Sequence, residues 1–273
     1  MTRCFRLVTG TLIAFLIVVL SWPFFKQTRP PEPVPVPYTG TKPKLALVLD
    51  DFGYTDRNFE ALGKIDAPLT LAVLPNLPYS QEACSRAVLN NMEWILHLPM
   101  EPIQENAPME KDTIMMSMDE ATIKDILRRS LTSVSGARGV SNHMGSAATG
   151  APRVMEVVFT ELKARNMFFL DSMTTPDSVC SSIAADMDVP YEKRDIFIDN
   201  IPEEDAIIKQ IGKAMKIARA KGKAIAIGHD KKITVEVLRR ATPYIQKSGI
   251  QFVTLLELVQ EEACSRHHPA KEN

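Results

Sequence analysis

Three histidines and a pair of acidic residues are the side chains of this sequence whose types and positions could support chemistry. His97 and His229 each follow an apolar run, Asp50 and Asp51 follow another, and His143 stands in a glycine-flanked turn. Imidazoles and carboxylates at the ends of buried strands can form a metal site or an acid–base site. One aspartate and two histidines can hold a catalytic divalent ion that keeps positions open for water.

The acidic pair has two interpretations. Successive side chains of a strand point to opposite faces, so one carboxylate could bind metal while the other accepts a proton from water. The alternative is a cap on the next helix, which the pattern places near Asp56. Gly53 favours the site, because glycine allows a close approach of the backbone. Each histidine taken singly could also be an ordinary core residue.

A second group of polar residues could support such a site. Asn142 and Ser146 could orient ligands or substrate, although residues 146–149 could simply begin a helix. Asp171, with Arg194 and Asp195, could form a charge pair that holds the catalytic base. An ordinary salt bridge is the alternative for these three residues.

Short apolar runs alternate with helical patterns from residue 44 onward. This order predicts one α/β domain built as a parallel sheet or barrel of seven or eight strand–helix units. Active residues of such barrels gather at the carboxyl ends of the strands, where Asp199 also falls. The strands are predicted at residues 45–49, 69–74, 93–97, 139–143, 167–170, 196–198, 224–227 and 250–254.

Three helices carry specific expectations. Residues 117–120 (SMDE) fit a capping box that begins a helix at Ser117. Residues 203–221 form a helix that Gly222 ends. The helix containing Val235 and Leu238 is expected to be interrupted by Pro243.

The amino-terminal sequence differs from the rest. Residues 7–25 carry no charge after Arg3 and Arg6, and as a helix they would be roughly 28 Å long, enough to span a bilayer. We expect a signal anchor over residues 1–25, favoured over a cleaved signal peptide. A Pro-rich linker at 26–42, the barrel domain at 43–262 and a disordered tail at 263–273 follow. The domain is therefore expected outside the cytoplasm, in the bacterial cell envelope, attached to the membrane through this helix.

Composition limits the partners. The 273 residues are 45% hydrophobic and 24% charged, with a net charge of -1. This balance argues against general binding to nucleic acid or to an anionic membrane surface. The exported part would hold Cys84, Cys180 and Cys264, which allow at most one internal disulfide. The oligomeric state is not predicted.

Six segments together resemble the divergent polysaccharide deacetylase family, which is related to the nodulation-type deacetylases. The resemblance extends from about Lys44 to Val259. The segments occur in the family's order, at residues 49–53 (LDDFG), 96–102 (LHLPMEP), 139–146 (GVSNHMGS), 169–172 (FLDS), 194–200 (RDIFIDN) and 226–229 (AIGH).

This resemblance implies a distorted (β/α) barrel and metal-dependent hydrolysis of an acetyl group on a sugar polymer. By motif position, Asp50 is implied as the general base and Asp51 as a metal ligand. His97 is implied as a second ligand, and His229 as the general acid that protonates the leaving group. The cofactor would be a divalent ion, most simply zinc, and the partner an envelope or extracellular polysaccharide.

The sequence departs from the wider superfamily at three positions. Glu101 stands where a second ligand histidine is usual, so we assign the third ligand to His143. Met173 replaces a common arginine, a role that Arg194 could take, and Asp230 replaces a proline. The departures at 101 and 173 keep open an alternative function, a non-catalytic glycan-binding or envelope regulatory protein on the same barrel. Another metal hydrolase, such as an esterase or phosphoesterase, is a further alternative.

Overall fold

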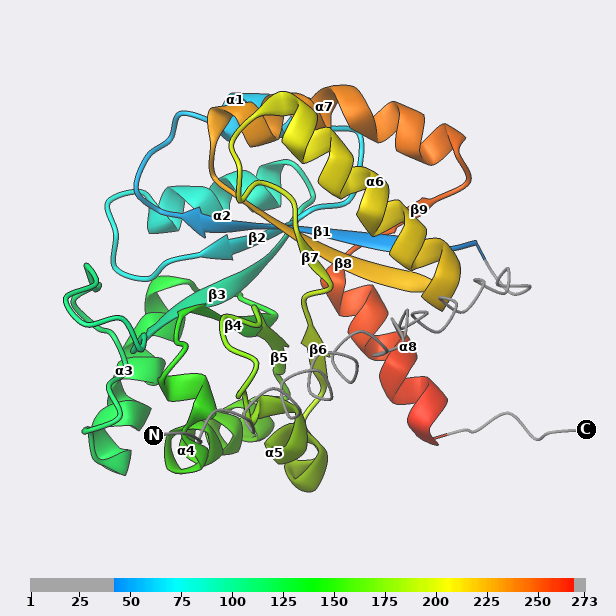
Figure 1. The fold of residues 1–273 in the computed structure, drawn as a ribbon. Coiled ribbons are helices and arrows are strands. Elements are labelled where there is room, and N and C mark those ends of the chain that lie inside the picture. Colours follow the sequence, from blue (N-terminus) through cyan, green and yellow to red (C-terminus); the bar gives the residue numbers. More distant parts are fainter. Residues whose placement is uncertain (1–41, 268–273) are drawn as a thin grey trace, which may run out of the picture. The chain divides into compact units, whose positions relative to one another are not determined.

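A computed structural model describes residues 42–267 of the chain, with side chains through residue 262. Its centre is strand β1 (Lys44–Phe52), which belongs to a nine-stranded sheet in which every pairing is parallel (Figure 1). The other strands are β2 (Thr70–Val73), β3 (Glu93–Met100), β4 (Gly139–Met144), β5 (Phe168–Asp171), β6 (Tyr191–Lys193), β7 (Ile196–Phe197), β8 (Lys223–His229) and β9 (Gln251–Val253).

The sheet has the order β6-β5-β4-β3-β2-β1-β8-β7, and β9 pairs with the beginning of β1. The edges β6 and β7 are not paired with each other in the part of the chain that the structure describes. The strands therefore form a curled, open (β/α) barrel, which confirms the predicted fold class.

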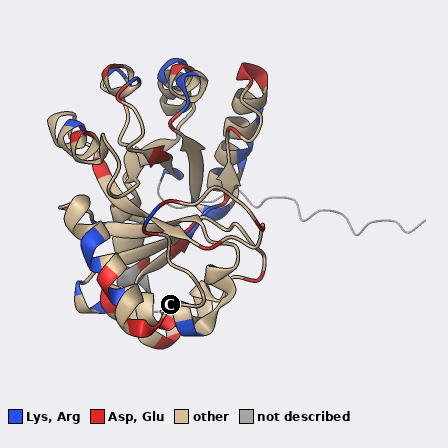
Figure 2. Ribbon diagram, turned by 90° about the vertical axis from the view of Figure 1, so that its left-hand side faces the viewer, with Lys and Arg blue, Asp and Glu red and all other residues tan. Residues whose placement is uncertain are grey.

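Most of the helices follow a strand and cover the outside of the sheet, whereas the last helix packs against its other face (Figure 1). Lysines and arginines are interspersed with acidic residues on these helices (Figure 2). The helices are α1 (Phe59–Leu62), α2 (Ser80–Leu89), α3 (Glu120–Ser133), α4 (Pro152–Ala164), α5 (Cys180–Met187), α6 (Glu204–Lys221), α7 (Lys232–Lys247) and α8 (Leu255–His267), with a short 3-10 turn η1 (Ala148–Gly150).

Alternation along the strands divides the core in two. Leu45, Leu47 and Leu49 of β1 belong to the large apolar cluster that also contains the buried residues of α2, α3, α4, α6 and α7. Ala46 and Val48 belong instead to a smaller cluster with residues of β8 and α8. We call the side of the second cluster the inner face. Since strand side chains alternate, Asp50 continues the inner face at the carboxyl end of β1.

Four local predictions need correction or extension. Asp119 rather than Ser117 caps α3, because its side chain accepts a hydrogen bond from the Thr122 amide. Pro243 lies inside α7 without interrupting it, since a buried apolar face anchors the helix on both sides of the proline. Strand β6 and helix α5 were not predicted. Helix α8 runs to His267, past the expected boundary of the domain at residue 262.

The predicted anchor at 1–25 and almost all of the linker at 26–42 lie outside the described residues. Within residues 42–267, no helix is both long and apolar enough to cross a bilayer. Cys84 and Cys180 are free thiols, and burial raises the pKa of Cys84 to about 11.

Two glycines provide a matched stability test. Gly53 has φ +131°, and a Cβ added there would lie 3.1 Å from Ser80 Oγ. Gly212, in the middle of α6, would meet nothing within 4 Å. We expect Gly53→Ala to lower the free energy of unfolding by about 1–3 kcal/mol, and Gly212→Ala to raise it by about 0.5–1 kcal/mol. Urea unfolding of both variants measures the difference, and equal effects would contradict the strained turn at Gly53.

Candidate metal centre and active site

Three predicted ligands converge at the carboxyl end of the sheet. Asp51 Oδ1 lies 3.0 Å from His143 Nδ1 and 3.4 Å from His97 Nε2. The imidazole rings of the two histidines meet edge to face, with centroids 5.0 Å apart. Ligand atoms of all three residues lie within 4.8 Å of one another. This spacing would allow a single ion to contact all three side chains.

The backbone explains why neighbouring carboxylates share one site. Asp51 adopts φ 70°, in the left-handed region, and the register of β1 against β2 shifts between Leu49 and Phe52. The regular alternation is therefore broken after Asp50. As a result Asp50 Oδ2 and Asp51 Oδ1 lie 3.6 and 3.4 Å from the same atom, His97 Nε2.

The histidines reach the site by ordinary strand geometry. Ile95 belongs to the inner cluster, so His97, two residues later, also faces inward. Pro99 of β3 is the register partner of His143 on β4. The chain then turns sharply through Met144 and Gly145, with φ 54° and 84°. The neighbouring strands thus bring His97 and His143 side by side.

The donor set fits a divalent ion. The buried atoms Asp50 Oδ1 and Asp51 Oδ1 have no hydrogen-bond partner among the described residues, although Asp51 Oδ1 is close to both imidazoles. Buried polar atoms without partners are uncommon in folded proteins, and an ion is one explanation. One carboxylate oxygen and two imidazole nitrogens match a three-ligand catalytic zinc site. The residues that would hold the ion are therefore Asp51, His97 and His143.

The two members of the acidic pair differ in electrostatics. Burial raises the pKa of Asp50, and the nearby imidazoles offset this effect only in part. Burial also raises the pKa of Asp51, but His143 and His97 outweigh it and lower that pKa well below its usual range. Asp51 is suited to remain an anion and a ligand, whereas Asp50 has the environment of a carboxylate that can take a proton.

His229 is held by a buried aspartate. Its Nδ1 lies 2.7 Å from Asp199 Oδ1, and its backbone amide donates to Asp199 Oδ2. Thr234 donates a further hydrogen bond to the same carboxylate. His229 is also the register partner of Asp50 on the neighbouring strand. The imidazole is therefore oriented on the inner side of the sheet next to the acidic pair.

Arg194 and Phe197 extend this arrangement. The phenyl ring stacks on the His229 imidazole, with centroids 5.5 Å apart and planes inclined by 25°. The Arg194 guanidinium lies 3.8 Å from the centroid of the same phenyl ring. It also donates hydrogen bonds to the backbone carbonyls of Ser172 and Met173. Arg194 thus links the end of β5 to β7 across the open side of the barrel.

The expected charge pair between Asp171 and Arg194 is replaced by other contacts. Asp171 lies two residues after Phe169 on β5, so the two side chains are on the same face of the strand. Phe169 belongs to the large apolar cluster, and Asp171 therefore points away from the inner face. Its carboxylate accepts hydrogen bonds from the Met173 amide and the Ser178 hydroxyl. Asp195 likewise lies elsewhere, where its carboxylate pairs with Lys221.

Asn142, Ser146 and Glu101 stabilise loops around the site. Asn142 accepts a hydrogen bond from the Ser172 amide and donates one to the Met144 carbonyl. Ser146 Oγ accepts a hydrogen bond from the Ile103 amide. The Glu101 carboxylate accepts a hydrogen bond from the Met116 amide. The backbone carbonyl of Glu101 accepts hydrogen bonds from the amides of Ala147 and Ala148, in the turn after His143. Glu101 therefore fastens the long loop after β3 and is not one of the three grouped ligands.

Two residues that contact the site histidines, Asp199 and Ser141, were not predicted from the sequence as their partners. The sequence places Asp199 at a strand end without indicating that it binds His229. Ser141, which contacts His97, carries one weak signal: it stands two residues before His143 and so shares its face of β4.

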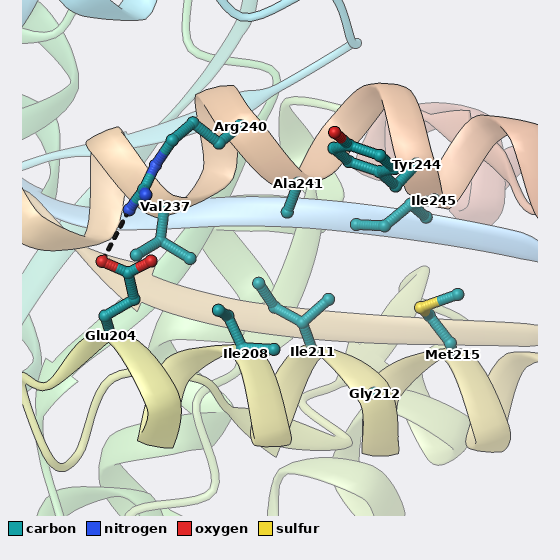
Figure 3. Close-up of a pocket in the computed structure, with 10 residues that line it drawn as sticks. All are labelled: Glu204, Ile208, Ile211, Gly212, Met215, Val237, Arg240, Ala241, Tyr244 and Ile245. Carbon is teal, nitrogen blue, oxygen red and sulfur yellow. Dashed lines mark ion pairs between the residues drawn. The ribbon is translucent and has the colours of Figure 1, made fainter.

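An apolar groove on the described surface lies away from this site. It has a volume of about 380 Å³ and runs between α6 and α7, where Ile211 and Met215 of α6 point toward α7, which contributes Val237 to the groove (Figure 3). A Glu204–Arg240 ion pair of 2.8 Å closes one end. No residue of the metal cluster or of the His229–Asp199 pair lines this groove.

Solved structures of other proteins have a similar fold. An uncharacterised protein of Agrobacterium tumefaciens C58 has a similar crystal structure, with a TM-score of 0.77 at 21% identity over 82% of this chain and 92% of that one. The catalytic domain of a peptidoglycan N-acetylglucosamine deacetylase from Eubacterium rectale ATCC 33656 is more distant, with a TM-score of 0.51 at 14% identity over 83% and 94%. The chain therefore shares its fold with this deacetylase domain.

The family follows from the sequence. Residues 47–259 match the model of the divergent polysaccharide deacetylases, and the chain belongs to that family. An uncharacterised protein of Escherichia coli (strain K12), YibQ, is 34% identical over 228 residues, covering 84% of this chain and 71% of the relative. The match confirms the resemblance inferred from the six sequence segments.

Proposed function

We propose that this protein is a metal-dependent hydrolase that removes acetyl groups from a polysaccharide of the bacterial envelope or extracellular matrix. The observation that carries the proposal is the convergence of Asp51, His97 and His143 beside two further groups, Asp50 and His229, which are register partners on the neighbouring strands β1 and β8. Family membership supports the substrate class. Zinc is the simplest ion for one oxygen and two nitrogen ligands.

Asp50 and His229 have separate roles in the proposed reaction. A divalent ion in the site would act as a Lewis acid toward the acetyl carbonyl and the attacking water. Asp50, whose pKa is raised by burial, accepts the proton of that water. His229 donates a proton to the leaving nitrogen or oxygen, while Asp199 fixes the direction of its imidazole. Release of the sugar amine or alcohol leaves acetate as the second product.

Acetate release tests the proposal. The full-length protein, loaded with zinc, is incubated with oligomers of N-acetylglucosamine and, in parallel, with O-acetylated xylan oligomers. The expected result is zinc-dependent acetate from one of the two, lost in Asp50→Asn. Release from the first identifies an amide substrate, and release from the second an ester. Acetate from neither oligomer would contradict the proposal.

A glycan-binding protein without turnover is the second candidate. It is favoured by Glu101, which occupies the usual place of a ligand histidine but bonds the Met116 amide instead. Such a protein would bind the oligomers without producing acetate, and Asp50→Asn would leave that binding unchanged. Measuring binding and acetate on the same oligomer separates the two functions.

We also propose that the domain works outside the cytoplasm, attached through residues 1–25. The support is the uncharged segment at 7–25 followed by the proline-rich segment at 29–37. An alkaline phosphatase fused after His267 is expected to be active in intact cells. An inactive fusion, with activity recovered on lysis, would place the domain in the cytoplasm.

The Asp199–His229 pair predicts a pH effect. Burial lowers the pKa of His229, but Asp199 outweighs burial and the pKa is raised above its usual value. A general acid must be protonated, so acetate release should fall as the pH rises through this raised pKa. Asp199→Asn removes the carboxylate charge, and the alkaline limb of the pH–rate profile should move to lower pH. An unmoved limb would exclude His229 as the acid.

A further inference from the structure

We propose that Ser141 is a positioning residue that holds His97 in the orientation required of a metal ligand. The inference rests on the proposed function and assigns a role to a residue that the sequence motifs leave without one. Ser141 Oγ lies 2.8 Å from His97 Nδ1, and both side chains are buried. The two residues are direct register partners on β3 and β4.

The geometry leaves one nitrogen of His97 for the site. With Nδ1 engaged by Ser141, Nε2 points to the acidic pair, 3.4 Å from Asp51 Oδ1 and 3.6 Å from Asp50 Oδ2. A serine hydroxyl can accept a hydrogen bond from Nδ1–H. The ring is then fixed in position, and the bare Nε2 is the atom available to an ion. Partners of this kind set both the tautomer and the direction of ligand histidines.

The position of Ser141 also follows from the fold. It lies two residues before His143 on β4, so both side chains face the inner side. One strand therefore supplies a ligand and the group that orients the ligand of its neighbour. Ser172 is the matched contrast, because it is a buried serine next to the end of β5 whose hydroxyl has no partner among the described residues.

Metal affinity of the full chain tests the role. Zinc binding is measured by competition with a chromogenic chelator for wild type, Ser141→Ala, Ser141→Thr and Ser172→Ala. We expect Ser141→Ala to weaken zinc binding by about 10–100-fold. Ser172→Ala should leave the affinity unchanged, and Ser141→Thr, which keeps a hydroxyl, should recover most of it. Equal affinities of wild type and Ser141→Ala overturn the role.

A second readout needs neither metal nor turnover. In metal-free protein labelled at the histidine ring nitrogens, NMR should show a single tautomer of His97 for wild type and an average for Ser141→Ala. Identical spectra overturn the role even if Ser141→Thr fails to fold. If the wild-type protein binds zinc but releases no acetate, the hydrolase function is rejected and the role of Ser141 is not. If the wild-type protein binds no zinc, both are rejected.

Discussion

Replacing His143 with alanine is expected to weaken zinc binding by more than about 100-fold and to abolish acetate release. Loss of a residue that only orients a ligand costs about 10–100-fold in affinity, and loss of a ligand should cost more. Of the two imidazole nitrogens beside Asp51 Oδ1, His143 Nδ1 is the nearer, at 3.0 Å. Removing it leaves two protein ligands, too few for the three-ligand catalytic sites known for zinc. Chelator competition and acetate release measure the two effects.

Glu101 provides the control for His143. If the residue in the usual histidine position were the third ligand, Glu101→Gln would lose zinc as completely as His143→Ala. The structure predicts otherwise, because the Glu101 carboxylate is bonded to the amide of Met116. We expect Glu101→Gln to retain zinc affinity within a few-fold, because the glutamine oxygen can still accept the hydrogen bond of the Met116 amide. The opposite ranking of the two variants would reassign the site.

Asp50→Asn is expected to reduce the rate of acetate release by about 100- to 10,000-fold, the range contributed by a positioned general base. Zinc affinity should be retained, since Asp51 and the two histidines remain. The metal-free variant should be at least as stable to urea as wild type, because burial disfavours the ionised Asp50 side chain and asparagine removes the buried charge. This combination separates a catalytic role from a structural one.

Asp51→Asn is the matched variant of Asp50→Asn. It changes the neighbouring residue by the same chemistry but removes a charged ligand, so both zinc affinity and acetate release should fall. If Asp50→Asn instead loses zinc and Asp51→Asn keeps it, the roles of the pair are reversed. If both variants keep full activity, the acidic pair takes no part in the reaction.

The barrel could be predicted because the sequence repeats a simple physical pattern. Parallel strands buried on both faces require continuous apolar runs, and the runs ending at Asp50, His97 and His229 are of this kind. Strand ends of one sheet lie on one edge, which brings the three residues together. Strand β6 was not predicted, because its three residues, Tyr191–Lys193, carry too little apolar character.

The details of the site depend on which face of a strand a residue occupies. Asp171 ends β5 and His97 lies three residues before the end of β3. Because side chains alternate along a strand, Asp171 points toward the large apolar cluster outside the sheet and His97 points inward. The sequence could have predicted the face that each side chain occupies only if the bounds of each strand had been known to within one residue. The left-handed backbone of Asp51 had no sequence signal beyond the following Gly53. The contacts of Asp199 and Ser141 depend on pairing between strands.

We propose that one divalent ion, held by Asp51, His97 and His143, serves hydrolysis assisted by Asp50. The decisive experiment measures metal content and acetate release on the same preparation of full-length protein, with Asp50→Asn beside it. We expect about one zinc per chain in both proteins and acetate from wild type alone. Acetate release that continues undiminished after the metal is removed, or that is equal in Asp50→Asn, would contradict it.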